Sequence, residues 1–163
     1  MRDNSFKYGF EKEKEFIDFL QKKGYKVRKA LEGDDMYNHI DGYILIGNSE
    51  FSFDFKTIKK KNRHGCKLDD DKVWVEIQNV KGNPGWLKGK AKYIVFEKEI
   101  EYLFVSRESL LRFVEKKVDF NEKCDIKLPY KLYQRKGRED LITIISLKDF
   151  YDYSKDYFSI KKQ

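Results

Sequence analysis

The stretch IDGYILIGNSEFSFDFKTI, residues 40–58, decides the fold because it contains two β-rich runs joined by a turn. Residues 40–46 and 51–58 are rich in aromatic and β-branched side chains, which favour strands. Gly47-Asn48-Ser49 lies between the two runs and is typical of a tight turn. We therefore expect a β-hairpin here.

The second strand of this hairpin alternates between apolar and polar side chains. One face carries Phe51, Phe53 and Phe55, and the other carries Ser52, Asp54 and Lys56. The polar face thus projects a carboxylate and an ammonium group side by side, two residues apart. Such a pair on its own is usually a surface ion pair.

Asp41 opens the preceding strand, so a hairpin would bring its side chain close to that of Asp54. Two carboxylates at that spacing would bind Mg²⁺, which prefers oxygen ligands. Lys56 would then polarise or deprotonate an attacking water, or neutralise charge on a phosphate. The plain alternative is that Asp41 is only a turn residue before a strand.

A helix is expected over residues 8–23, ended by Gly24. A step of about 100° per residue places Glu13 in the middle of the apolar stripe, whereas Glu11 and Glu15 fall on the polar face. That stripe consists of Phe10, Phe16, Ile17 and Leu20. Burial of a carboxylate is costly unless the group is paired or binds a metal, so Glu13 is a candidate functional residue. The alternative is a wide stripe in which Glu13 lies at the edge or pairs with a lysine.

The rest of the chain combines further strands with one more helix. We expect strands over residues 26–30, 73–80, 93–96, 102–105, 131–135 and 141–146, a loop over 31–38, an irregular segment over 81–92, and a helix over 106–117 capped by Ser106. This order indicates an α/β or α+β fold with a mixed central β-sheet flanked by helices. A single compact domain over 1–163 is expected, with its core at about 8–118 and a C-terminal hairpin and tail over 119–163.

The composition is that of a folded, basic protein. Of 163 residues, 40% are hydrophobic, which is enough for a core although 39% are charged. The net charge of +7 favours an anionic partner, most commonly nucleic acid; the alternative is a set of Lys-rich solvated faces. No signal-peptide or bilayer-spanning run is visible, so we expect a cytoplasmic location and no membrane partner. Cys66 and Cys124 are expected to be free thiols.

Two basic segments are the expected contacts to nucleic-acid phosphates. They contain Lys59, Lys60, Lys61 and Arg63 in one loop, and Lys88 and Lys90 in a glycine-rich segment. The glycine-rich spacing is one residue short of a phosphate loop and lacks its Ser or Thr, so no nucleotide cofactor is expected. Glu76 and Gln78, on the strand over 73–80, are accessory candidates as a further carboxylate and a phosphate or base contact. The alternative for both is a solvated sheet face.

The order of a helix with Glu13, then Asp41, then Asp54-x-Lys56 resembles the PD-(D/E)xK nuclease superfamily, which has the restriction-endonuclease-like fold. Residues 13–25, EKEFIDFLQKKGY, are similar to the first helix of archaeal Holliday-junction resolvases of that superfamily, and the match selects Glu13. Residues 74–79 and 82–86 are similar to phage-type members, for which a host-cell cytoplasm is expected. The resemblance covers about residues 8–58, with a looser continuation to 93–96. It departs from the family pattern at Ile40, where the family has proline before the aspartate.

The resemblance implies a metal-dependent endonuclease that hydrolyses DNA phosphodiester bonds with Mg²⁺ or Mn²⁺. By it, Asp41 and Asp54 hold the metal together with the carbonyl of Phe55, while Glu13 binds a water at the metal or a second ion. Lys56 orients the nucleophile. Nucleases of this fold often form homodimers, although the sequence shows no clear interface for one.

Three alternatives stay open. A resolvase of Holliday junctions or other branched DNA would have the same catalytic core as a general endonuclease. A non-catalytic DNA-binding protein would carry Asp41, Asp54 and Lys56 only as surface charges. RNA in place of DNA is the third alternative.

Overall fold

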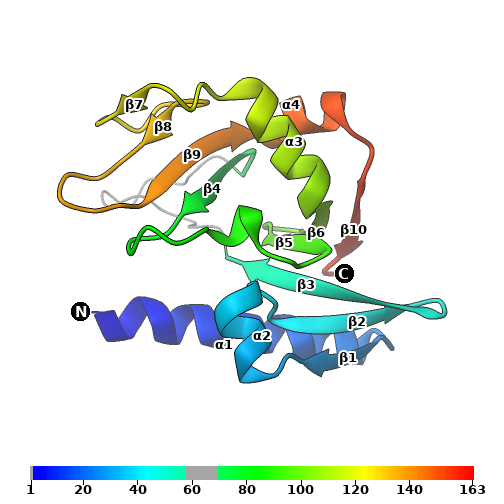
Figure 1. Ribbon diagram of the computed structural model, residues 1–163. Helices are drawn as coiled ribbons and strands as arrows, with labels where there is room; N and C mark the ends of the chain where they lie inside the picture. Colours follow the sequence, from blue (N-terminus) through cyan, green and yellow to red (C-terminus); the bar gives the residue numbers. More distant parts are fainter. Residues whose placement is uncertain (1, 58–69) are drawn as a thin grey trace.

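The computed structural model describes residues 2–57 and 70–163, which form an α+β domain (Figure 1). In chain order its elements are α1 (Arg2–Lys22), β1 (Lys26–Lys29), α2 (Glu32–Asn38), β2 (Gly42–Ile46), β3 (Ser49–Lys56), β4 (Lys72–Gln78), the 3₁₀ helix η1 (Trp86–Lys88), β5 (Tyr93–Glu97), β6 (Glu101–Ser106), α3 (Arg107–Lys117), β7 (Lys123–Cys124), β8 (Leu132–Tyr133), β9 (Leu141–Ser146), α4 (Leu147–Tyr153) and β10 (Tyr157–Lys161).

The larger sheet has six strands in the order β1-β2-β3-β5-β6-β10. Strand β3 is parallel to β5 and all other neighbours are antiparallel, so the sheet is mixed. The predicted hairpin is confirmed, because β2 and β3 pair with Gly42 opposite Phe53. Gly42 is required there, since an added Cβ atom would lie 2.7 Å from the Phe53 ring.

The smaller sheet has four strands in the order β4-β9-β8-β7, and only β7 and β8 are parallel. The predicted mixed β-sheet is confirmed by the larger sheet, whereas this second sheet was not predicted. Strands β4 and β9 pair with each other, and their apolar side chains, such as Val75 and Ile145, are buried in a core shared with the larger sheet. Alternation shows that a strand has one buried face, but it does not show which strand lies beside it.

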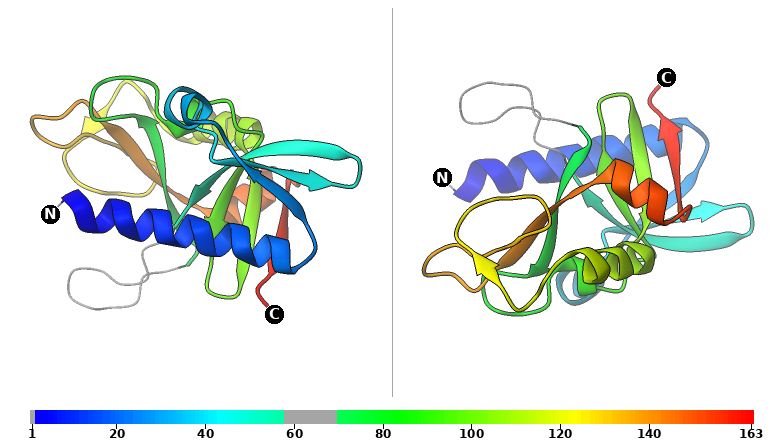
Figure 2. Two further views of the ribbon diagram at one scale, coloured as in Figure 1. Left: turned by 90° about the horizontal axis from the view of Figure 1, so that it is seen from below. Right: turned by 90° about the horizontal axis from the view of Figure 1, so that it is seen from above.

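Two hydrophobic cores separate the layers of the domain. Helix α1 covers one face of the larger sheet, where the Phe16 ring stacks on Phe55 and meets Phe53 edge-on. The other face of the larger sheet packs against the smaller sheet, and α3 and α4 complete that core (Figures 1 and 2). Strand β3 therefore lies between the two cores, and this position limits solvent access to the side chains at its end.

The helix predictions are confirmed in part. Ser106 caps α3 by accepting a hydrogen bond from the Ser109 N–H, and Gly24 follows α1 with a left-handed φ of +93°, as expected. However, α1 begins at Arg2, well before residue 8. The predicted loop over 31–38 is wrong, because α2 forms there with three acidic residues in its first turn, where the helix dipole favours them.

The C-terminal region contributes more than the predicted hairpin. Strand β10 pairs with β6 and completes the larger sheet, and α4 follows β9 directly. Cys124 is a free thiol, as predicted, whereas Cys66 lies outside the described residues. None of the helices within residues 2–57 and 70–163 has the length and apolar character that a bilayer-spanning segment needs.

Candidate active site

The C-terminal end of β3 brings three of the predicted site residues together. Asp41 lies just before β2, and its backbone N–H donates to the Phe53 carbonyl at 2.8 Å, which extends the hairpin pairing by one residue. Its carboxylate then accepts a hydrogen bond from the Phe55 N–H at 2.7 Å. The Asp41 side chain is thereby held across the end of β3, next to Asp54 and Lys56.

Asp54 and Lys56 share the polar face of β3, as the alternation predicts. Their side chains form an ion pair of 2.8 Å between Lys56 Nζ and Asp54 Oδ1. Asp54 is only 1% exposed, whereas the Lys56 side chain keeps 31% of its surface exposed and lies over the Trp86 ring. Within the described residues, no N–H or O–H group donates to the second carboxylate oxygen, Asp54 Oδ2. An unpaired oxygen in so buried a carboxylate is costly unless a cation or a proton reaches it.

The two aspartates are close enough to share a proton. Burial raises the pKa of Asp41 well above its ordinary value, and the neighbouring charge of Asp54 raises it further. Burial likewise raises the pKa of Asp54, against the opposing effect of Lys56. For Lys56, burial alone would lower the pKa, but the carboxylates of Asp54 and Asp41 outweigh it and raise the pKa. The lysine is therefore cationic at neutral pH.

Glu13 approaches this pair from α1. Its side chain is 19% exposed, and Lys29 Nζ lies 3.9 Å from its Oε1 atom. Burial raises the pKa of Glu13 to about 7, with a further contribution from the charge of Asp41. Glu13 is half-buried on the helix face that also carries the buried Phe16 and Leu20, whereas Phe10, which was expected in the same stripe, is exposed. Of the two alternatives for Glu13, pairing with a lysine matches the approach of Lys29.

Asp35 is a further carboxylate near the site that sequence reasoning missed. Its charge contributes to the raised pKa of both Glu13 and Asp54. The residue was hidden in a predicted loop, whereas it lies in the first turn of α2. The signal that would have found it is the run of Glu32, Asp34 and Asp35, which is typical of a helix N-terminus.

The carboxylates of Asp41 and Asp54 have the donor atoms and the charge that a divalent cation requires, although they do not form a closed coordination site. Across residues 2–57 and 70–163, no group of three or more His, Cys, Asp and Glu side chains converges as a metal cage. Mg²⁺ is usually held by one or two carboxylates together with waters and substrate phosphates. The unpaired oxygen of Asp54 beside the Asp41 carboxylate therefore fits such an ion by its donor type and charge.

The accessory candidates occupy different surroundings. Glu76, on β4, is close enough to Lys56 for its charge to help raise the pKa of that lysine. The Gln78 side chain donates a hydrogen bond to the Glu139 carbonyl, which holds the loop before β9 in place. Lys88 and Lys90 are exposed beside the site elements, and the Lys90 N–H is bonded to the Asn38 carbonyl at the end of α2. The predicted phosphate contacts Lys59, Lys60, Lys61 and Arg63 lie outside the described residues.

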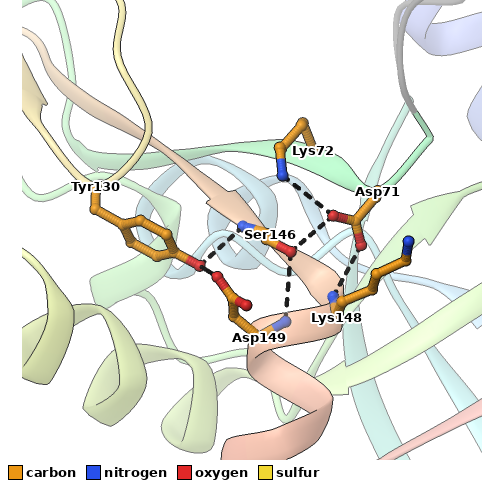
Figure 3. Close-up of polar contacts among 6 residues, drawn as sticks. All are labelled: Asp71, Lys72, Tyr130, Ser146, Lys148 and Asp149. Atoms are coloured by element: carbon orange, nitrogen blue, oxygen red, sulfur yellow. Dashed lines mark hydrogen bonds and ion pairs between the residues drawn. The ribbon is translucent and has the colours of Figure 1, made fainter.

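A second polar cluster lies at the start of α4, and its members are Asp71, Lys72, Tyr130, Ser146, Lys148 and Asp149 (Figure 3). Asp71 accepts hydrogen bonds from the Ser146 hydroxyl at 2.7 Å and from the Lys148 backbone N–H at 2.8 Å. Burial would raise the pKa of Asp71, but these donors outweigh it and lower the pKa. These hydrogen bonds connect the start of β4 to the junction of β9 and α4.

Comparisons of the chain with protein-family models, with curated proteins and with solved structures gave no significant match. The chemistry of the site at the end of β3 is therefore the basis on which a function can be argued.

Proposed function

We propose that the protein is a divalent-cation-dependent nuclease that hydrolyses phosphodiester bonds in DNA. The observation that carries the proposal is the buried, unpaired Oδ2 atom of Asp54 beside the Asp41 carboxylate, with Lys56 2.8 Å from the other oxygen of Asp54. Two carboxylates share one ammonium group here, which leaves negative charge available to bind a metal ion. The ammonium group next to them suits a phosphate bound to that ion.

The ligands would be Asp41, Asp54 and the carbonyl of Phe55, which would hold Mg²⁺ or Mn²⁺. The Phe53 carbonyl points toward Asp41, and carbonyls two residues apart in a strand point the same way. The Phe55 carbonyl is thus directed to the side on which the Asp41 carboxylate lies. A bound cation would stabilise the negative charge that develops on the phosphoryl oxygens. Glu13 would hold a water, or a second ion, at the edge nearer α1.

Lys56 lies beside the proposed metal ligands, with its ammonium group 2.8 Å from Asp54 Oδ1. An ammonium group carries three hydrogen-bond donors and a positive charge, which suit it to hold a water and to pair with a phosphate oxygen. We assign it the orientation of the attacking water and the neutralisation of phosphate charge. The exposed Lys88 and Lys90, together with the basic segment over 59–63, would contact DNA phosphates without reading the sequence.

The test is incubation of purified protein with plasmid, linear and branched DNA, and with RNA, in Mg²⁺, Mn²⁺ or EDTA. We expect cleavage of DNA only in the presence of the cation. Asp54→Asn should lower the rate about 100-fold or more while DNA binding in EDTA is kept, because the charge that holds the cation is lost.

The matched control is Asp18→Asn, which removes an exposed carboxylate from α1, away from the site. This variant should cleave like the wild type. Absence of cation-dependent cleavage in the wild type, with DNA binding intact, would identify a non-catalytic DNA-binding protein. An Asp54→Asn variant as active as the wild type would remove the proposed metal site.

A further inference from the structure

The N-terminal half of α1 carries exposed aromatic side chains that lead toward the candidate site. Phe6 is 79% exposed and Phe10 is 50% exposed, although both are large apolar residues. Figures 1 and 2 show that this half of α1 continues past the end of β3. Phe6 and Phe10 are four residues apart, and Glu13 follows three residues later, so the three side chains follow one line along the helix.

The ammonium group of Lys29 contacts both Phe10 and Glu13 and so connects Phe10 to the site. Lys29 Nζ lies 4.5 Å from the centre of the Phe10 ring and 3.9 Å from Glu13 Oε1. With a rise of about 1.5 Å per residue, Phe10 lies about 4.5 Å and Phe6 about 10 Å from Glu13 along the axis. This is the length of one to two nucleotides beside a scissile phosphate.

Cations border the aromatic line on its solvent side. Lys7 precedes Phe10 by three residues and Lys14 follows it by four, so both lie next to the ring on the helix surface, and both are exposed. Aromatic rings alternating with ammonium groups are typical of surfaces that bind single-stranded nucleic acid, where bases stack and phosphates pair with lysines. A second copy of this basic chain would instead bring like charges together, which disfavours it as the occupant.

We infer that Phe6 and Phe10 stack on unpaired bases next to the cleaved phosphate, so that the substrate is DNA with a single-stranded segment at the cleavage point. This inference rests on the proposed nuclease function. Bases inside a duplex are stacked on each other and cannot reach the rings, whereas bases of a single strand or a flap can. Lys7, Lys14 and Lys29 would contact the phosphates on either side.

The test compares the Phe6→Ala/Phe10→Ala double variant with the wild type on single-stranded and duplex DNA of one sequence. Binding is measured by fluorescence anisotropy in EDTA, and cleavage by kcat/KM in Mg²⁺. We expect the wild type to prefer the single strand, and the double variant to bind it about tenfold or more weakly, with a much smaller change for the duplex. Phe10→Trp should retain the preference, and Phe120→Ala, at an exposed aromatic beyond α3, should leave it unchanged.

Equal losses on both substrates, or no loss, would overturn the inference. A dimer of the wild type that dissociates in the double variant, seen by sedimentation, would assign the aromatic line to a second copy and also overturn it. Hydrolysis of bis(p-nitrophenyl) phosphate by the wild type separates the two proposals, because this diester has no base to stack. Its hydrolysis without any single-strand preference would refute only the inference, whereas failure to hydrolyse it or any DNA would refute the nuclease function as well.

Discussion

Two regions of the molecule hold buried or half-buried carboxylates at the end of a strand, in opposite electrostatic surroundings. One region contains Asp41 and Asp54 at the end of β3, and the other contains Asp71 just before β4. Asp71 is surrounded by donors, which are the Ser146 hydroxyl, the Lys148 N–H and the Lys72 ammonium group (Figure 3). Asp41 and Asp54 face each other, with Glu13 nearby and Lys56 as the ion-pair partner of Asp54. The pKa of Asp71 is accordingly lowered, and the pKa values of Asp41 and Asp54 are raised.

This difference separates a carboxylate that stabilises the fold from a group of carboxylates whose negative charge one lysine does not balance. Donors around Asp71 favour its charged form, so folding gains from its ionisation. At the end of β3 the charged forms repel one another, so the folded protein is more stable when a proton or a cation is bound there. Sites of this second kind are where perturbed pKa values indicate function.

The same substitution at Asp71 and at Asp41 should have opposite effects on stability, and this is the largest effect expected from the comparison. At pH 8, Asp71→Asn should lower the free energy of unfolding by about 1–2 kcal/mol, because charge-assisted hydrogen bonds are lost. Asp41→Asn should raise it by about 1 kcal/mol in EDTA, because repulsion is removed while its amide oxygen can still accept from the Phe55 N–H. Urea denaturation measures both.

Added Mg²⁺ completes this test. It should stabilise the wild type and the Asp71→Asn variant, but not Asp41→Asn, because only the last lacks a ligand. A loss of stability in EDTA for Asp41→Asn similar to that for Asp71→Asn would show that the two regions do not differ as described.

The pH dependence of the site should follow the raised pKa of Glu13. The folded protein holds this proton up to about pH 7, whereas an unfolded chain loses it near 4.5. In EDTA, the free energy of unfolding should therefore fall as pH rises through this window, and the affinity for Mg²⁺ should rise by up to about tenfold per pH unit over the same range. Thermal unfolding and calorimetric titration of the wild type against Glu13→Gln measure both trends.

If the difference in free energy of unfolding between the wild type and Glu13→Gln stays constant from pH 5 to pH 8, Glu13 titrates as an ordinary solvent-exposed carboxyl and the prediction fails. Asp71 provides the opposite sign within the same molecule. Its pKa is lowered, so its contribution is present above the ordinary aspartate pKa and is lost as pH falls through the folded value.

The smallest expected effect concerns the exposed lysines beside the site. Lys88→Ala and Lys90→Ala should each reduce the slope of log K for DNA against log salt by about 1, and should weaken binding to all sequences alike. Fluorescence anisotropy over a salt series in EDTA measures the slope. Lys98→Ala, at the turn between β5 and β6, is the control. An unchanged slope in both variants would place the DNA elsewhere on the surface.

Local patterns predicted those features that depend on neighbouring residues. The hairpin of β2 and β3, the alternation of Asp54 and Lys56 with Phe53 and Phe55, and the Ser106 cap all follow from spacing along the chain. The convergence of Asp41 with Asp54 follows from the hairpin, because pairing in register determines where Asp41 must lie.

The same local patterns failed wherever a distant segment decided the outcome. Residues 31–38 contain Gly33-Asp34-Asp35 and were expected to form a loop, yet α2 forms and Asp34 accepts hydrogen bonds from Asn38 and Tyr43. The strand over 73–80 was correctly expected, but its partner β9 is about 70 residues away, and hydrophobic alternation does not identify a partner.

The sequence by itself determined a basic α+β chain in which a D-x-K pair shares one strand face and an aspartate precedes the adjacent strand. Only the tertiary structure decided that Asp54 is buried with an unpaired oxygen, that Glu13 is half-buried beside Lys29, and that the charge of Asp35 acts on both carboxylates. The physical reason is that side-chain direction follows from backbone periodicity, whereas burial and pKa depend on which distant segments exclude water and bring their charges close.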